Sequence, residues 1–158
     1  MTSFKLITDK CKDCYITVFP KKHLKSITGV KAFIKNTNNN FLLVQRSTTD
    51  KYNLLMWEFP GGIIKKFESP LNSLVREVFE ETGIKILCSS NNCYVYSDDL
   101  NIGLKSIYAG FRRYIFIYSC IVKNDVKIKL SYEHSNYLWC SKKQALSLNL
   151  TKDTKEFI

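Results

Sequence analysis

Three glutamates fall on neighbouring turns of one predicted helix and offer the oxygen ligands of a metal site. Glu77, Glu80 and Glu81 are three and four residues apart, so their carboxylates project together from one helix face. Carboxylates crowded in this way destabilise a helix unless a cation lies among them. Hard oxygen ligands favour Mg²⁺ or Mn²⁺, which also take substrate phosphates as ligands. The spacing predicts a divalent-cation site, and a solvated acidic surface is the alternative.

The residues around the glutamates define the ends of this helix. Ser69 suits the N-cap, and Pro70 suits the first helical position, where its missing N–H is harmless. Gly83 suits the C-terminal end, because glycine readily adopts the left-handed conformation that ends a helix. The predicted buried stripe consists of the residues at helical spacing, Leu71, Leu74, Val75, Val78 and Thr82.

One arginine stands among the carboxylates. Arg76 comes eight residues after Glu68 and four before Glu80, so its planar guanidinium can bind a carboxylate and hold it in place. From Gly62 to residue 84 the chain has the sequence GIIKKFESPLNSLVREVFEETGI. This pattern of glycine, glutamates and arginine resembles the Nudix box, the metal-binding loop-helix-loop of hydrolases that cleave nucleoside diphosphates linked to another moiety.

The resemblance extends over roughly residues 27–158 and implies an α/β (α+β) fold, the Nudix-type α/β/α sandwich with a mixed β-sheet. Residues 1–26 would form an N-terminal extension or an extra edge strand. Residues 57–62, WEFPGG, are similar to the entry of the box in MutT-type nucleoside triphosphate pyrophosphohydrolases. Members of that group convert a nucleoside triphosphate, often an oxidised one, to the monophosphate and pyrophosphate.

The same resemblance implies roles for individual residues. The expected ligands of Mg²⁺ (or Mn²⁺) are the carbonyl of Gly61 and the side chains of Glu77, Glu80 and Glu81. Arg76 would orient these carboxylates through Glu68. Glu68 and Gly83 would serve the structure of the box.

Substrate contacts and a general base are implied as well. Arg46 matches the position of a phosphate-contacting arginine, and Phe59 and Gly62 are expected to contact the substrate, with the nucleobase near Phe59. Core packing is the alternative role for an aromatic residue beside a short strand. The base that activates water would be Glu80 on the helix or Glu133 on the loop before the last strand.

The loop at residues 63–67 departs from the family pattern. It reads IIKKF, so that Lys65 and Lys66 replace acidic or small residues and Phe67 takes the usual glycine position. The loop conformation and the substrate class can therefore differ from those that the resemblance implies.

Composition narrows the possible classes of protein. The 158 residues are 45% hydrophobic and 13% aromatic, which predicts one globular domain. No run approaches the roughly 18 apolar residues of a membrane span, so we expect a cytoplasmic protein without membrane partners. The net charge of +10 would attract a nucleotide polyphosphate; nucleic acid is a less favoured partner that remains open. The expected state is a monomer or a homodimer.

Six cysteines raise the question of a zinc site or a disulfide. Cys11 and Cys14 form one Cys-x-x-Cys pair, but a second pair is missing. We therefore predict reduced thiols and no stoichiometric zinc.

Hydrophobic patterning predicts strands around the box and short helices at the end of the chain. Turn-forming asparagines at residues 36–40 indicate a hairpin, and residues 97–103 indicate a loop. The predicted strands are residues 14–19, 28–34, 41–45, 84–87, 93–96, 108–122, 127–130 and 137–139, and the predicted C-terminal helices are residues 141–148 and 151–157.

Several functions share these features. Within the enzyme class, the alternatives are an ADP-ribose or dinucleoside polyphosphate pyrophosphatase and an mRNA-decapping enzyme. A non-catalytic Nudix-fold sensor that binds a nucleotide is the alternative from another class. The full set of Glu77, Glu80 and Glu81 favours a catalyst over a sensor.

Overall fold

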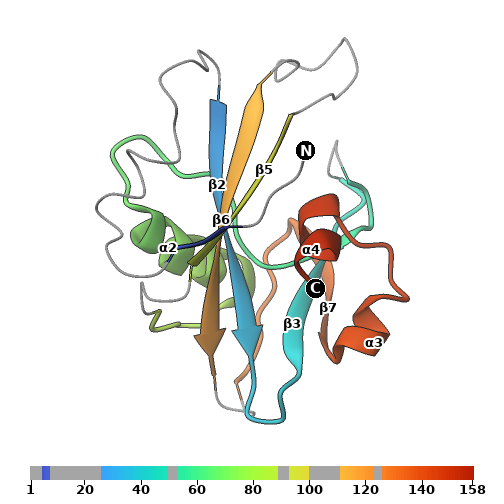
Figure 1. The fold of residues 1–158 in the computed structure, drawn as a ribbon. Helices are drawn as coiled ribbons and strands as arrows, with labels where there is room; N and C mark the ends of the chain where they lie inside the picture. The colour runs from blue at the N-terminus through green and yellow to red at the C-terminus, as the bar shows by residue number, and fades with distance from the viewer. Residues whose placement is uncertain (1–4, 8–25, 50–52, 89–92, 100–110, 123–125) are drawn as a thin grey trace.

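The computed structural model describes residues 5–7, 26–49, 53–88, 93–99, 111–122 and 126–158 (Figure 1). Within this part of the chain, seven strands form one mixed sheet in the order β1-β5-β6-β2-β3-β4, and β7 pairs with β3. The elements are β1 (Lys5–Ile7), β2 (Ser26–Lys35), β3 (Phe41–Arg46), β4 (Trp57–Glu58), α2 (Pro70–Thr82), β5 (Cys93–Asp99), β6 (Arg112–Ile121), β7 (His134–Cys140), α3 (Lys142–Ala145) and α4 (Lys152–Phe157).

Helices cover both faces of the sheet, which confirms the predicted α/β/α sandwich (Figure 1). One apolar core lies under α2 and includes Leu74 and Val78. The other lies under α3 and α4 and includes Phe59, Ala145 and Leu150. The sheet is therefore buried on both sides, as in other layered α/β proteins.

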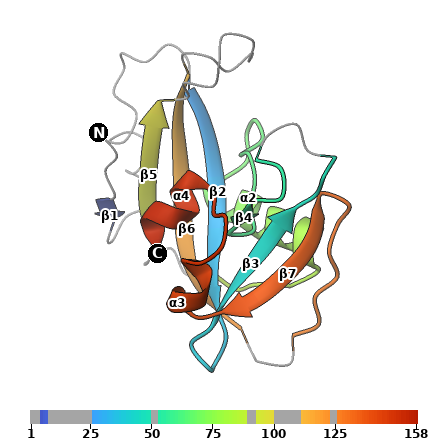
Figure 2. The ribbon, with the colours of Figure 1, turned by 90° about the vertical axis from the view of Figure 1, so that its right-hand side faces the viewer.

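The hairpin between β2 and β3 is present as predicted. Asn36 Oδ1 accepts from the N–H groups of Asn38 and Asn40, and Asn39 has a left-handed φ of 62°. After the pair Lys35–Phe41, β3 leaves β2 and pairs with β7, as Figure 2 shows. The space beside β2 is taken by the segment that leads into the box.

Parallel pairing of β2 with β6 forms the middle of the sheet, from Ser26–Arg112 to Lys35–Ile121. On the other side of β6, β5 runs antiparallel and continues to Asp99, beyond the predicted strand. The extension is stabilised by Arg113, which donates to both carboxylate oxygens of Asp98 at 2.9 and 3.0 Å.

Several sequence predictions differ from the structure. Residues 84–87 and 127–130 form no strand; instead Lys129 N–H donates to Thr82 O at 2.9 Å, so the second segment follows the end of α2. The helix predicted over 141–148 is limited to α3, which begins with a capping box of Ser141 and Gln144. Val75 is 40% exposed and lies outside the buried stripe.

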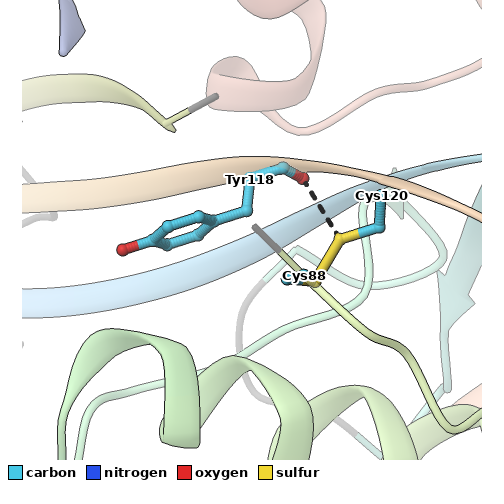
Figure 3. The surroundings of a disulfide bond; sticks show 3 residues. All are labelled: Cys88, Tyr118 and Cys120. Carbon is cyan, nitrogen blue, oxygen red and sulfur yellow. Dashed lines mark hydrogen bonds between the residues drawn. A yellow bond between two sulfur atoms is a disulfide. The ribbon is translucent and has the colours of Figure 1, made fainter. Parts of the chain in front are cut away.

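The cysteine prediction is wrong at one pair. Cys88 and Cys120 form a disulfide between the segment after α2 and the end of β6 (Figure 3). Their Cα atoms are 5.6 Å apart, within the usual range for a disulfide. Cys93 and Cys140 are buried, whereas Cys11, Cys14 and the strand predicted at 14–19 lie outside the described residues.

The N-terminal segment contributes β1, which pairs antiparallel with β5 at the edge of the sheet. The division into residues 1–26 and 27–158 stays a prediction. In the described part of the chain, no helix has the length and apolar character to cross a membrane.

Candidate active site

The helix that carries the glutamates begins and ends as its sequence predicts. Ser69 Oγ accepts from Asn72 N–H at 3.2 Å, and Pro70 is the first helical residue. Gly83 has a φ of 71° and donates its N–H to Phe79 O at 2.9 Å. These caps fix the two ends of α2, and its buried residues Leu74 and Val78 turn one face of the helix toward the sheet.

Arg76 lies at the centre of the carboxylate cluster. It binds Glu68 through two hydrogen bonds of 2.8 Å, and its Nη1 reaches Glu77 at 2.6 Å and Glu80 at 3.1 Å. These hydrogen bonds from Arg76 lower the pKa of Glu68 to about 2. Glu68 therefore stays ionised and fixes the arginine between the loop and the helix.

Two glycines bring the loop against the helix. Gly61 has a φ of 143°, and a Cβ there would lie 2.1 Å from Val30 O. Its N–H donates to Glu81 Oε2 at 2.8 Å. A Cβ on Gly62 would lie 2.5 Å from Glu77 Oε2. The absence of side chains thus gives both glutamates their places beside the main chain.

Buried and half-buried polar groups on β2, β3, β4 and β7 adjoin this cluster. Glu58 is 3% exposed and forms ion pairs with Lys31 and with Arg46, whose Nη1 is 2.5 Å from Glu58 Oε1. His134 Nε2 lies 3.8 Å from Glu58 Oε1 and 4.0 Å from Glu81 Oε1. Burial would raise the pKa of Glu58, but the charges of Lys31 and Arg46 and the nearby His134 hold it well below its usual range.

Sequence reasoning missed Lys31, Glu58 and His134. Lys31 stands alone among apolar residues of a predicted strand, and Glu58 lies inside WEFPGG. A charged residue at a buried strand position needs a partner, and this is the signal that could have found them.

Glu81 has an environment unlike that of the other box glutamates. It is 6% exposed, whereas the side chain of Glu80 is 53% exposed. Burial first, and then the charge of Glu58, raise the pKa of Glu81 from 4.5 to about 8. Without a cation, this carboxyl is largely protonated at neutral pH.

Stability of the metal-free protein should therefore depend on pH through Glu81. A raised folded-state pKa contributes stability that is fully present below about pH 4.5 and is lost as the pH rises through about 8. Glu81→Gln removes this titration while keeping an oxygen that can accept from Gly61. With a chelator present, we expect the variant to melt about 4 °C or more above wild type near pH 8, with a smaller difference near pH 5. A melting difference that does not grow with pH would contradict this assignment.

The donor set fits a hard divalent cation. The carboxylates of Glu77, Glu80 and Glu81 and the carbonyl of Gly61 are all oxygen donors. Within the described ranges, no three acidic, histidine or cysteine side chains already converge on one point. Arg76 lies among them, and because it keeps two bonds to Glu68, its bonds to Glu77 and Glu80 can be exchanged for a cation.

The other predicted site residues lie at different depths. Phe59 is fully buried, with ring centroids 5.3 Å from Phe33 and 5.5 Å from Phe157, so its predicted contact with a nucleobase does not fit this structure. Glu133 is exposed in the turn before β7, and its carbonyl accepts from Ser47 N–H at 2.9 Å. This bond places Glu133 near the end of β3, which carries Arg46. Its role as a base stays a prediction.

A cavity of about 210 Å³ opens beside the glycines. Asp153 lines it at 1% exposure, and its Oδ2 has no hydrogen-bond partner among the described residues. Its Oδ1 lies 3.7 Å from Nη1 of Arg113, which also lines the cavity. Phe59 N–H donates to Thr154 Oγ1 at 3.3 Å, which fixes α4 against the segment before the glycines. The lining of the cavity also includes Ile27, Lys31, Arg46, Gly61, Gly62, Ile63 and Ile115.

Comparison with known proteins defines the family. The NUDIX domain model matches residues 25–158, so this chain belongs to the NUDIX domain family. It is 29% identical to the CTP pyrophosphohydrolase of Escherichia coli (strain K12) over 127 residues, covering 80% of this chain and 84% of that protein. Among solved structures, the MutT protein from Methanosarcina mazei Go1 has a TM-score of 0.69 and 28% identity, covering 84% of this chain and 90% of that one.

A shorter match is more similar in sequence. The 8-oxo-dGTP diphosphatase of Buchnera aphidicola subsp. Schizaphis graminum is 46% identical over 48 residues, which cover 30% of this chain. The matched segment spans 37% of that relative, so the alignment covers little more than a third of its length.

Proposed function

We propose that this protein is a divalent-cation-dependent Nudix hydrolase that cleaves a phosphoric anhydride bond of a nucleotide, with nucleoside triphosphates as substrates. The observation that carries the proposal is the cavity lined by Gly61, Gly62 and Asp153. The two glycines adjoin Glu81 and Glu77 of the box, and the rest of the lining includes apolar side chains and the buried carboxylate of Asp153. That combination suits a polyphosphate attached to a nucleobase.

The box residues would provide the metal centre. Glu77, Glu80 and Glu81, with the carbonyl of Gly61, would hold Mg²⁺ or Mn²⁺, and the bound cation would neutralise phosphate charge and activate water. Arg76 would keep the carboxylates oriented by its bonds to Glu68. Either Glu133 or Glu80 would accept the proton of the attacking water.

Basic residues in the cavity would bind the phosphates. Arg46 lines the cavity with its side chain 26% exposed, and Lys31 lines it beside Glu58. Guanidinium groups suit phosphate because they present parallel N–H donors. The charges of both side chains are partly balanced by Glu58, so a phosphate has to compete with that carboxylate.

The part of the cavity lined by isoleucines would hold the nucleobase. Ile27, Ile63 and Ile115 supply apolar walls for a planar ring. Asp153 Oδ2 can accept from a base N–H, and Arg113 can donate to an adjacent base oxygen or nitrogen. Oxidation at C8 converts N7 of a purine from an acceptor into an N–H donor, which suits this carboxylate. Oxidised purine triphosphates are therefore the first candidates.

The reaction class can be tested by locating the attacked phosphorus. We expect nucleoside monophosphate and pyrophosphate as first products, with ¹⁸O from labelled water in one of them, because the box can place a cation between adjacent phosphates. The assay uses a panel of ordinary and oxidised triphosphates, with ADP-ribose included. Orthophosphate as first product, or a much higher activity on ADP-ribose, would overturn the triphosphate assignment and leave the family unchanged.

The same panel includes Asp153→Asn as a matched variant. An amide can donate as well as accept, so the variant should lose part of its preference among bases, by roughly the 10- to 100-fold that one buried hydrogen bond provides. An unchanged ranking of substrates would remove Asp153 from base recognition.

A further inference from the structure

A separate cavity lies on the face of the sheet that α3 and α4 cover (Figure 2). Residues from the start of α3, the end of α4 and the hairpin between β2 and β3 line it, and we call it the hairpin cavity. Its volume is about 300 Å³. Small-molecule sites begin at roughly this size. Among the described residues it shares no lining with the cavity beside Gly61 and Gly62, so a ligand in it would leave the carboxylate cluster unoccupied.

Aromatic rings form one wall of the hairpin cavity. Phe33, Phe41 and Phe157 line it. The ring centroid of Phe33 lies 5.3 Å from that of Phe41 and 5.1 Å from that of Phe157. Phe33 and Phe157 are only half-buried. A planar aromatic ligand can pack on rings of this kind, because π-systems attract one another in offset and edge-to-face arrangements.

The charged side chains of the described lining are two lysines, Lys35 and Lys142. Lys35 Nζ lies 5.0 Å from the ring centroid of Phe33, a cation–π contact that places its ammonium group beside the aromatic wall. Lys142 is exposed at the start of α3. Neither lysine forms an ion pair with a described residue. Both charges can therefore bind an anionic ligand.

The number of charges favours phosphate over carboxylate. A phosphate monoester carries a charge of about −1.5 to −2 at neutral pH, which matches two lysines better than a single carboxylate does. Asn39 also lines the cavity, and its exposed amide can both donate to and accept from a hydroxyl group. The walls thus offer partners for a ring, a hydroxylated sugar and a phosphate.

We infer that the hairpin cavity is a second ligand site, separate from the active site, for a small aromatic compound that carries a phosphate group. Its ring would lie against Phe33 and Phe157, and its phosphate would bind Lys35 and Lys142. A nucleoside monophosphate is the simplest probe of this class. The inference goes beyond the proposed function, since no residue of the Nudix box takes part.

The test is calorimetric titration of the metal-free protein with a chelator present, so that binding through a cation at the box does not contribute. The probes are a nucleoside monophosphate, the same nucleoside without phosphate, and ribose 5-phosphate. We expect one molecule of the monophosphate per chain. It should bind about 5- to 100-fold more tightly than ribose 5-phosphate, the usual contribution of base stacking. The nucleoside should bind more weakly than the monophosphate, because it lacks the group that pairs with the lysines.

A pair of matched variants locates the site. Lys142→Gln should weaken binding of the monophosphate by roughly 3- to 10-fold, the scale of one exposed charged contact. Lys143→Gln is the control, because Lys143 is the next residue of α3, is exposed, makes the same change of charge and does not line the hairpin cavity. Both variants should melt like wild type, since neither side chain is packed.

Each contrary outcome overturns the inference. An equal loss in Lys142→Gln and Lys143→Gln would mean attraction by the general positive charge. Unchanged affinity in Lys142→Gln would place the ligand elsewhere, and equal affinities for the monophosphate and ribose 5-phosphate would remove the aromatic wall from binding. Absence of binding at millimolar concentrations would remove the site. None of these results bears on hydrolysis, so the proposed function is tested independently.

Discussion

Replacing Glu80 by glutamine is expected to lower turnover by about a hundredfold or more, because the cation would lose an anionic ligand that helps it bind phosphate and activate water. The fold should be little affected. The side chain of Glu80 is 53% exposed, and its contact with Arg76 is a single bond of 3.1 Å. Loss of activity with an unchanged melting temperature would therefore indicate a role in the site.

This prediction is measured as kcat over a range of Mg²⁺ and Mn²⁺ concentrations, with a chelator as the zero-metal point. Glu156→Gln is a suitable control, because Glu156 is an exposed carboxylate on α4 and makes the same change of charge. Wild-type turnover in Glu80→Gln would show that this helix face does not bind the metal.

A second large effect is expected at Glu133. If this side chain is the general base, Glu133→Gln should reduce kcat by roughly 10²–10⁴-fold, with KM changed little, because the amide cannot take the proton of water. Its position in the turn that bonds to Ser47 brings it near Arg46 without burying it. An exposed side chain of this kind can move toward a bound substrate at a low cost in free energy, because it leaves no packed position.

The decisive comparison is between Glu133→Gln and Glu80→Gln across pH. A general base contributes an acidic limb to the profile of kcat, and its removal should flatten that limb. A Glu133→Gln protein within about threefold of wild-type kcat would return the role to Glu80 or to another box glutamate.

Local signals predicted the parts of the site that local sequence determines. Ser69, Pro70 and Gly83 fix the ends of α2, and the asparagines of residues 36–40 fix the hairpin, because caps and turns depend on a few adjacent residues. The spacing of the box placed Glu68, Arg76 and Glu77 within one cluster for the same reason.

The remaining features depend on contacts between distant segments. Lys31 and Glu58 are 27 residues apart, and their pairing requires β2 to lie beside the segment that follows β4. Asp153 reaches the cavity only because α4 bonds to Phe59 across a separation of 95 residues. Neither arrangement has a local signature, and the disulfide between Cys88 and Cys120 likewise depends on where β6 ends.

Phe59 shows a related limit of prediction from local sequence. Its neighbours in WEFPGG indicated a role in substrate binding, whereas the ring enters the core under α3 and α4. Residues alternate between the two faces of an extended segment, so the choice of face decides between substrate and core. The face on which Phe59 lies is set by how the whole sheet packs against α3 and α4.

Hydrogen bonds of the main chain hold residues 60–62 against β2 and α2. Val30 N–H donates to Gly62 O, Ala32 N–H to Pro60 O, and Gly61 N–H to Glu81, and none of these bonds uses a side chain of the loop that follows. Exchanges of side chains at residues 63–67 can therefore accumulate without displacing the carboxylates. Among descendants of one ancestor, the choice of substrate can diverge while the cleavage machinery is inherited intact.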